Sequence, residues 1–269
     1  MAIKRPRPVS DPSDPPRARR TALGTPALCI RFDHAISPFA WDDRPGIEFW
    51  SVRAELTYAD VPGRPAAVVA TASLCRVDLN TCLELGYELD SIDYDLGIIA
   101  SAIDESQRQL NDYSVHGGAN TTILITEDVV VDRFWRGNRF GPALVLYAAY
   151  LLRADVTFLN PVALGTRLDA RGNCVSDYYI RRPGPLAQKK VEAAWRRAGF
   201  RKLADGVVWH PAPSNWTERP DDGAIARKTL RKLEVLADQP SAKAWWRRRT
   251  ANQTKGSRHF GFEQGLTST

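Results

Sequence analysis

The sequence lacks several features that define common classes of protein. Its four cysteines show no C-x-x-C spacing and its four histidines are scattered, so we expect no structural zinc site and no metal. No run of about 18 apolar residues is present, and we therefore expect no membrane span. No apolar segment follows the basic N-terminus, so we expect no signal peptide and a cytoplasmic location.

Two common phosphate-binding motifs and any internal repeat are also missing. The sequence contains no G-x-x-x-x-G-K-S/T, the loop that cradles nucleotide phosphates in many ATPases. It also lacks a G-x-G-x-x-G followed by an acidic residue about 20 positions later, the usual pattern for dinucleotides. These absences argue against ATP and NAD as ligands.

The composition is that of a globular protein with basic ends. The 269 residues are 43% hydrophobic and 25% charged, which is enough apolar material for a sizeable core. The net charge of +6 would suggest a nucleic-acid ligand if it were evenly spread. However, residues 1–25 carry net +4 and residues 213–269 net +5, whereas residues 26–212 carry net −3. The basic excess therefore says little about what the central part binds.

Composition and pattern divide the chain into three parts. Residues 1–26 are rich in Pro, Arg and Asp, and we expect a disordered tail. Residues 27–212 alternate strand and helix patterns, which predicts one α/β domain with a mixed sheet. Residues 213–269 form a basic helical extension whose last residues we expect to be disordered.

The elements expected within the domain follow from periodicity and from turn residues. A helix is expected within 90–106 with Asp90 or Ser91 as its cap, another at 141–155 with Pro142 in its first turn, and a third at 185–200 stopped by Gly199. The expected strands are 47–59 and 66–79 as a hairpin, 121–131, 156–164, and a strand pair or strand with a tight turn at 201–210; residues 165–184 are expected to be a loop.

The stretch from Arg136 to Gly141 lies between an apolar strand and an almost wholly apolar helix. The first backbone N–H groups of a helix lack internal partners and favour negative charge. Gly137 and Gly141 allow close approach of a ligand, and Arg136 and Arg139 can bond phosphate oxygens. The stretch therefore predicts an anion site that suits a pyrophosphate.

This loop resembles the acyl-CoA loop of the GNAT superfamily of N-acetyltransferases. That signature is V-x-P-x-x-Q/R-x-x-G-x-G/A at a junction between a strand and a helix. Val131, Arg136 and Gly141 match it, while Arg133 replaces the Pro and Arg139 replaces the middle Gly. A second motif of the family, N-x-x-A-x-x-x-Y-x-x-x-G-F, is similar to residues 188–200, where Gly199 and Phe200 match and Gln188 and Trp195 are related substitutes.

The resemblance covers about residues 47–210 and implies the acyl-CoA N-acyltransferase fold, a mixed, mostly antiparallel central sheet flanked by helices. It implies acetyl-CoA as co-substrate. It also implies that strand 121–131 splays from strand 156–164, so that backbone groups reach the pantetheine arm and polarise the thioester carbonyl. The cofactor-binding residues that it implies are Val129, Val131, Arg136, Gly137, Asn138, Arg139, Phe140 and Gly141.

Acetyl transfer to an amine needs a base, because an amine of pKa about 10.4 is almost entirely protonated at neutral pH. Some members of the family carry Glu or His where this chain has Glu127, so we expect Glu127 to be the base, directly or through water. Strand alternation predicts that Glu127 shares a face with Val129 and Val131, with Asp128 on the other face. The usual tyrosine acid is replaced by Trp195, and the choice among the substitutes Tyr147, Tyr150, Tyr178 and Tyr179 stays open.

Two charged stretches each allow two interpretations. The acidic run of Glu84, Glu88, Asp90, Asp93 and Asp95 either attracts a cationic amine or is a solvated helix face. The segment 244–249, AWWRRR, either binds a nucleic acid or acidic partner or packs its tryptophans on the domain. The sequence thus favours an N-acetyltransferase acting on a primary amine, small-molecule or peptide. The alternative is a non-catalytic adaptor of the same fold that binds nucleic acid or an acidic partner through its tail. Acceptor, acyl chain length and oligomeric state stay open.

Overall fold

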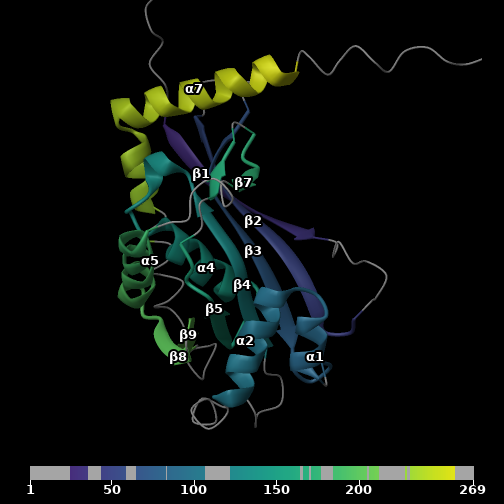
Figure 1. Cartoon of the computed structure of the whole chain (residues 1–269). Helices are drawn as coiled ribbons and strands as arrows, with labels where there is room; N and C mark the ends of the chain where they lie inside the picture. The colour runs from purple at the N-terminus through teal and green to yellow at the C-terminus, as the bar shows by residue number, and fades with distance from the viewer. Residues whose placement is uncertain are drawn as a thin grey trace, which may run out of the picture.

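The structure is a computed structural model (Figure 1). It describes residues 25–35, 44–58, 65–82, 84–106, 122–163, 166–169, 171–176, 184–204, 206–211, 228 and 231–257, with side chains as far as residue 251. The expectations of disorder at the two ends therefore fall almost wholly outside the described residues, because nearly all of the tail at 1–26 and everything after 257 lie beyond them.

A seven-stranded sheet forms the centre of the domain in the order β1-β2-β3-β4-β5-β9-β8. All neighbouring pairs are antiparallel except β4 with β5, which are parallel. The prediction of an α/β domain with a mixed, mostly antiparallel sheet is thus confirmed. The strands are β1 (Pro26–Ala35), β2 (Ile47–Tyr58), β3 (Ala67–Asp78), β4 (Thr122–Val131), β5 (Val156–Leu159), β8 (Arg201–Ala204) and β9 (Val207–Pro211).

The first strand was not predicted. β1 pairs with β2 along its whole length, and Leu28, Ile30 and Phe32 turn toward the core, while Cys29 and Arg31 are exposed. This is a period-two pattern that the sequence contains. It was missed because β1 begins at Pro26, the residue assigned as the last of the disordered tail.

Helices cover both faces of the sheet. On one face α1 (Leu85–Asp90) and α2 (Tyr94–Glu105) pack on a cluster that includes Cys75 and Ile125, and we call this the α2 face. On the other face α4 (Phe140–Leu151) packs on a cluster that includes Leu74 and Leu124, and we call this the α4 face. Neighbouring residues in β3 and β4 thus alternate between the faces, as a pleated strand requires.

Helix boundaries differ from the prediction at one important position. The cap of α2 is Asp93 rather than Asp90 or Ser91, because the Asp93 carboxylate accepts a hydrogen bond from the Asp95 N–H at 2.7 Å. Asp90 instead ends the short helix α1, which was not predicted. Pro142 does lie in the first turn of α4, as predicted.

The end of the third predicted helix and the strands after it are confirmed. Helix α5 (Pro185–Arg197) packs Trp195 in a cluster with Val145 of α4, on the α4 face of the sheet. Gly199 ends the helix with φ of 98°, in the left-handed region that glycine favours. Strands β8 and β9 form the antiparallel pair that follows.

A small hairpin occupies part of the stretch that was expected to be a loop. Strands β6 (Thr166–Leu168) and β7 (Cys174–Ser176) pair with each other, and Leu168 packs on Val68 and Val130. Three-residue strands are too short to show a period, which is why the sequence did not predict them. The Thr71 hydroxyl lies 3.4 Å from the Cys174 thiol, so the hairpin sits on the same face as Cys75, the α2 face.

The C-terminal extension packs on the domain. Residues 231–237 are helical, and α7 (Pro240–Ser257) crosses the end of the sheet (Figure 1). Trp245 and Trp246 are 6% and 1% exposed, and Trp246 donates to the Leu56 carbonyl at 3.1 Å. The interpretation that these tryptophans pack on the domain is confirmed. In the part of the chain described, no helix is long and apolar enough to cross a membrane.

Candidate anion-binding and catalytic site

Strand β5 is shorter than the predicted strand 156–164, and β4 extends beyond its end. They pair from Ile123 with Val156 to Thr126 with Leu159, where β5 ends, while β4 continues to Val131. On its other edge β4 stays paired with β3 as far as Val131. In the described residues, the last five residues of β4 therefore have no ladder partner on the β5 side. The expected divergence of the two strands stays a prediction, because the pairing ends where β5 itself ends.

A β-bulge lies at the point in β4 where its pairing with β5 ends. Thr126 pairs with Leu74, but the next pair along is Asp128 with Ser73, so Glu127 is an extra residue in β4. A bulge of this kind re-aims side chains and breaks the period of two. It lies between the inner half of β4, covered by α2 and α4, and the outer half that leads into the Arg/Gly loop.

The bulge corrects the predicted faces. Val129 and Val131 lie against α4, because a Cβ built on Gly141 would meet their methyl groups at 3.2 and 3.5 Å. Glu127 lies on the opposite side: its charge helps to raise the pKa of the Cys75 thiol, which belongs to the α2 face, although burial is the larger cause. The prediction that Glu127 shares a face with Val129 and Val131 is therefore wrong.

Asp128 was predicted to lie on the face opposite Glu127, and this is also wrong. The charge of Asp128 acts on the Cys174 thiol of β7, which sits on the α2 face. The bulge thus presents two adjacent carboxyl groups on one face of the sheet, in the region between α2 and the β6–β7 hairpin. Simple alternation would have separated them.

Glu127 has the acid–base properties that a proton acceptor needs. Its pKa is raised to about 7, first by burial, then by the charges of Asp93 and Asp128. Solvent still reaches its side chain, so a substrate could also reach it. Burial also raises the pKa of Asp128, whose Oδ1 atom is buried without a hydrogen-bond partner among the described residues. A carboxyl group of pKa near 7 is well matched to accepting a proton at neutral pH.

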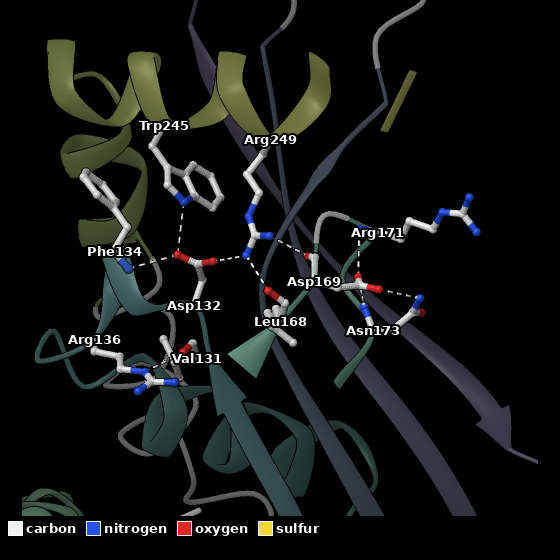
Figure 2. Close-up of polar contacts among 10 residues, drawn as sticks. All are labelled: Val131, Asp132, Phe134, Arg136, Leu168, Asp169, Arg171, Asn173, Trp245 and Arg249. Atoms are coloured by element: carbon white, nitrogen blue, oxygen red, sulfur yellow. Dashed lines mark hydrogen bonds and ion pairs between the residues drawn. The ribbon is translucent and has the colours of Figure 1, made fainter. Parts of the chain in front are cut away.

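The loop after β4 begins with a short helical turn, η1 (Arg133–Trp135). Asp132 caps it, because its carboxylate accepts from the Phe134 N–H at 2.9 Å and its carbonyl from the Trp135 N–H at 2.8 Å. Trp135 is 1% exposed and anchors the turn in the core. Figure 2 shows this turn beside α7.

Two residues of the loop adopt left-handed backbone conformations. Gly137 has φ of 86° and Arg139 has φ of 62°. Arg139 is the N-cap residue of α4, and its carbonyl accepts the helical bond from the Ala143 N–H at 3.1 Å. Arg139 replaces the middle glycine of the signature, yet it keeps a conformation that glycine adopts without cost. For arginine this conformation costs about 1 kcal/mol.

The backbone amides of the loop are the main feature of the site. Within the described residues, the N–H groups of Gly137, Arg139, Phe140 and Gly141 have no protein acceptor, while the Asn138 N–H closes the turn at residues 136–137. The side chains of Arg136, Asn138 and Arg139 are exposed around them. Consecutive amides that point out of the start of a helix form a site for an anion, which the arginine guanidinium groups would reinforce.

The other predicted cofactor-binding side chains are mostly engaged in structure. The Arg136 Nε–H donates to the Val131 carbonyl at 2.9 Å, which folds the side chain back along β4 (Figure 2). The Asn138 amide donates to the Trp135 carbonyl at 3.2 Å, and Phe140 is buried. For Asn138 and Phe140, as for Val129 and Val131, any contact with a ligand would come from the backbone.

The residues of the second motif also have structural roles. The Gln188 side chain donates to the Pro161 carbonyl at 2.7 Å and accepts from the Ala163 N–H at 2.8 Å, so α5 fixes the chain that follows β5. Trp195 is buried edge-on against Phe200, with ring centres 4.9 Å apart. Of the candidate acids, Tyr178 and Tyr179 lie outside the described residues, and the choice of a general acid stays open.

Only part of the acidic run approaches the bulge. Of its five residues, Asp93 is the one whose charge raises the pKa of Glu127. Its neighbours along the chain include Tyr87 and Tyr94, which are 74% and 76% exposed. The start of α2 therefore adds one carboxylate to the pair on β4.

Comparisons with known proteins give no independent assignment: no family model, no curated protein and no solved structure matches the chain. Among the described residues, no group of three or more His, Cys, Asp and Glu side chains is arranged to hold a metal ion. The functional argument therefore depends on the geometry of β4, its bulge and the loop after it.

Proposed function

We propose that the chain is an N-acetyltransferase of the GNAT type, which moves an acetyl group from acetyl-CoA to a primary amine. The observation that carries the proposal is the group of loop amides without a protein acceptor, those of Gly137, Arg139, Phe140 and Gly141, which follow a strand that extends beyond its parallel neighbour. The amides would bind the diphosphate of the coenzyme at the start of α4. The part of β4 beyond the end of β5 would leave backbone groups for the pantetheine arm.

The bulge supports the chemical step. At pH 7 only about one in 2,500 molecules of an amine of pKa 10.4 is neutral, so a base that takes the proton makes attack more frequent. The neutral nitrogen attacks the thioester carbonyl carbon, a C–N bond forms and the C–S bond breaks. The ammonium proton passes to the Glu127 carboxylate before attack, directly or through water, and the second proton, which the nitrogen loses after attack, goes to the departing thiolate, so that coenzyme A leaves as the thiol. With a pKa of about 7, Glu127 is ionised in about half of the molecules at neutral pH and can accept that proton.

The charges near the bulge favour a cationic acceptor. The charges of Asp93 and Asp128 both act on Glu127. An ammonium group brought to this surface would be attracted before it loses its proton. The adaptor alternative has less support, because Trp245 and Trp246 are buried and cannot stack on bases.

Calorimetric titration tests the coenzyme site. We expect acetyl-CoA and CoA to bind in the micromolar range, and Arg136→Glu to weaken binding at least about tenfold, because it sets a negative charge beside the diphosphate. Arg153→Glu, at the opposite end of α4, is the matched charge-reversal control and should bind normally. Absence of binding by the unmodified chain, or equal loss in both variants, would contradict the proposal.

A turnover assay tests the base. Glu127→Gln should slow acetyl transfer to a panel of small and peptide amines by about 10²–10⁴-fold, the usual contribution of a general base, while acetyl-CoA still binds. An unchanged rate in this variant would exclude Glu127 as the base.

A further inference from the structure

One buried carboxylate at the end of β4 joins three parts of the molecule. Asp132 is 6% exposed, and its backbone N–H donates to the Val69 carbonyl at 2.8 Å, which fixes it to β3. Its Oδ1 accepts from the Phe134 N–H and, at 3.0 Å, from the Trp245 indole N–H of α7. Its Oδ2 forms an ion pair with Arg249 of α7 (Figure 2). Asp132, the cap that shapes the start of the anion loop (residues 136–141), is therefore held by helix α7.

Arg249 also reaches the β6–β7 hairpin. Its guanidinium donates to the Asp169 carbonyl at 2.6 Å and to the Leu168 carbonyl at 3.0 Å. The Asp169 carboxylate in turn accepts from the Arg171 and Asn173 N–H groups at 2.8 and 2.9 Å, which closes the hairpin turn. A planar guanidinium with five N–H groups suits such divergent acceptors better than an ammonium group does.

Aromatic packing holds α7 in the same place. The Trp245 ring lies edge-on to Trp135 at 5.3 Å and stacked beside Phe134 at 5.9 Å. Trp135 and Phe140 share one buried cluster with Trp245 and Trp246. Helix α7 thus shares a cluster with Trp135, which precedes the loop amides, and with Phe140, which lies near their end.

We propose that Arg249 and Trp245 are positioning residues: through Asp132 they hold the anion loop in its binding conformation and tie it to the β6–β7 hairpin beside the bulge. The identity of the anion as the diphosphate of coenzyme A rests on the proposed function above. The positioning itself rests only on the contacts of Asp132 and Arg249. A loop with two left-handed residues is held in that shape by its surroundings, and loss of the cap lets it sample others.

The test compares four single-residue variants of the full chain. Arg249→Gln removes the ion pair. Trp245→Phe removes the indole N–H but keeps an aromatic ring at this position. Arg249→Lys keeps the positive charge but lacks the planar guanidinium with its five N–H groups. Arg248→Gln is the matched control, because Arg248 is exposed one position earlier on α7. Hydrogen exchange of the segment 132–141 is measured for each, together with CoA affinity and the KM and kcat for acetyl-CoA.

We expect Arg249→Gln and Trp245→Phe to speed exchange of the hydrogen-bonded amides of Asp132, Phe134 and Trp135 more than exchange in β2 and β3. We also expect weaker CoA binding, with KM for acetyl-CoA raised about tenfold in Arg249→Gln and kcat within about twofold, because loss of an ordered loop affects binding before chemistry. Arg249→Lys should recover part of the change, and Arg248→Gln should match the unmodified chain.

Two results would overturn the proposal. One is an unchanged exchange rate at the amides of Asp132, Phe134 and Trp135 in Arg249→Gln, and the other is an increase there that is no larger than in β2 and β3, which would show a purely structural role. Hydrogen exchange needs no ligand. Failure of the unmodified chain to bind CoA would therefore refute the proposed function, while the exchange rates would still decide whether α7 positions the loop.

Discussion

Replacing Glu127 with glutamine should stabilise the fold at alkaline pH. The folded state raises the pKa of Glu127 from 4.5 to about 7, mainly by burial. A raised carboxyl pKa means that the folded chain binds the proton more tightly than the unfolded chain does, so stability is lost as pH rises from about 4.5 to above 7. Glutamine resembles the protonated acid and does not ionise, so the variant escapes this loss.

The expected size of the effect is modest because Glu127 is enclosed only in part: neighbouring groups desolvate its carboxyl, but water still reaches the side chain. Solvent screening reduces the full linkage value, and we expect Glu127→Gln to gain about 1 kcal/mol over the unmodified chain between pH 5 and pH 8. The measurement is urea unfolding of both proteins at these two pH values. Glu105→Gln, an exposed substitution at the end of α2, is the control and should show an offset that does not change with pH.

The contrary result is a difference between Glu127→Gln and the unmodified chain that is the same at pH 5 and pH 8. It would mean that the bulge does not place Glu127 in a shielded, acidic environment. The proposed base would then lose its physical basis, whatever the turnover assay gave.

Three further predictions concern the surroundings of the site. Asp93→Asn keeps the cap of α2, since asparagine also caps helices, but removes a charge that raises the pKa of Glu127; the pH midpoint of acetyl transfer should fall, and an unmoved midpoint would contradict the assignment. Arg139→Gly should be more stable than Arg139→Ala by about 1 kcal/mol in denaturant unfolding, the reverse of the usual order within helices, because φ at this position is 62°. Arg249→Gln leaves the Asp132 carboxylate without its ion-pair partner, although two N–H donors still bond it, and should cost about 1 kcal/mol of unfolding free energy, whereas Arg248→Gln should cost almost nothing; equal losses would show that the Asp132–Arg249 pair does not stabilise the fold.

The sequence predicted those parts of the fold that have strong local signals. The β2–β3 hairpin, the apolar helix α4 and the stop at Gly199 all follow from periodicity and from residue types with marked backbone preferences. Strand β1 had its signal too, in the alternation of residues 28–33, but its proline start was assigned to the tail.

The arrangement of the site was less predictable because it depends on one irregularity. The bulge at Glu127 depends on the pairing register of β3 and β4 along their whole length. The alternation of residues within β4 alone does not predict it. The bulge places Glu127 on the α2 face, where the charges of Asp128 and Asp93 act on its carboxyl group. Local motifs suggested the candidate site residues but not the faces of the sheet on which they lie.

The link between α7 and the loop could not be predicted for a different reason. Asp132 and Arg249 are 117 positions apart, and each alone looks like an ordinary charged residue. Packing of the tryptophans of 244–249 on the domain was one of two interpretations that the sequence allowed, but the contacts they make depend on tertiary structure.

The central claim is that the amides after Trp135 bind the diphosphate of coenzyme A. Nuclear magnetic resonance of the ¹⁵N-labelled chain during titration with CoA tests it most directly. The account predicts that the largest amide shifts fall at residues 137–141, with smaller ones along the outer half of β4. Saturation with CoA that leaves the amide signals of Gly137 and Gly141 unmoved would contradict it.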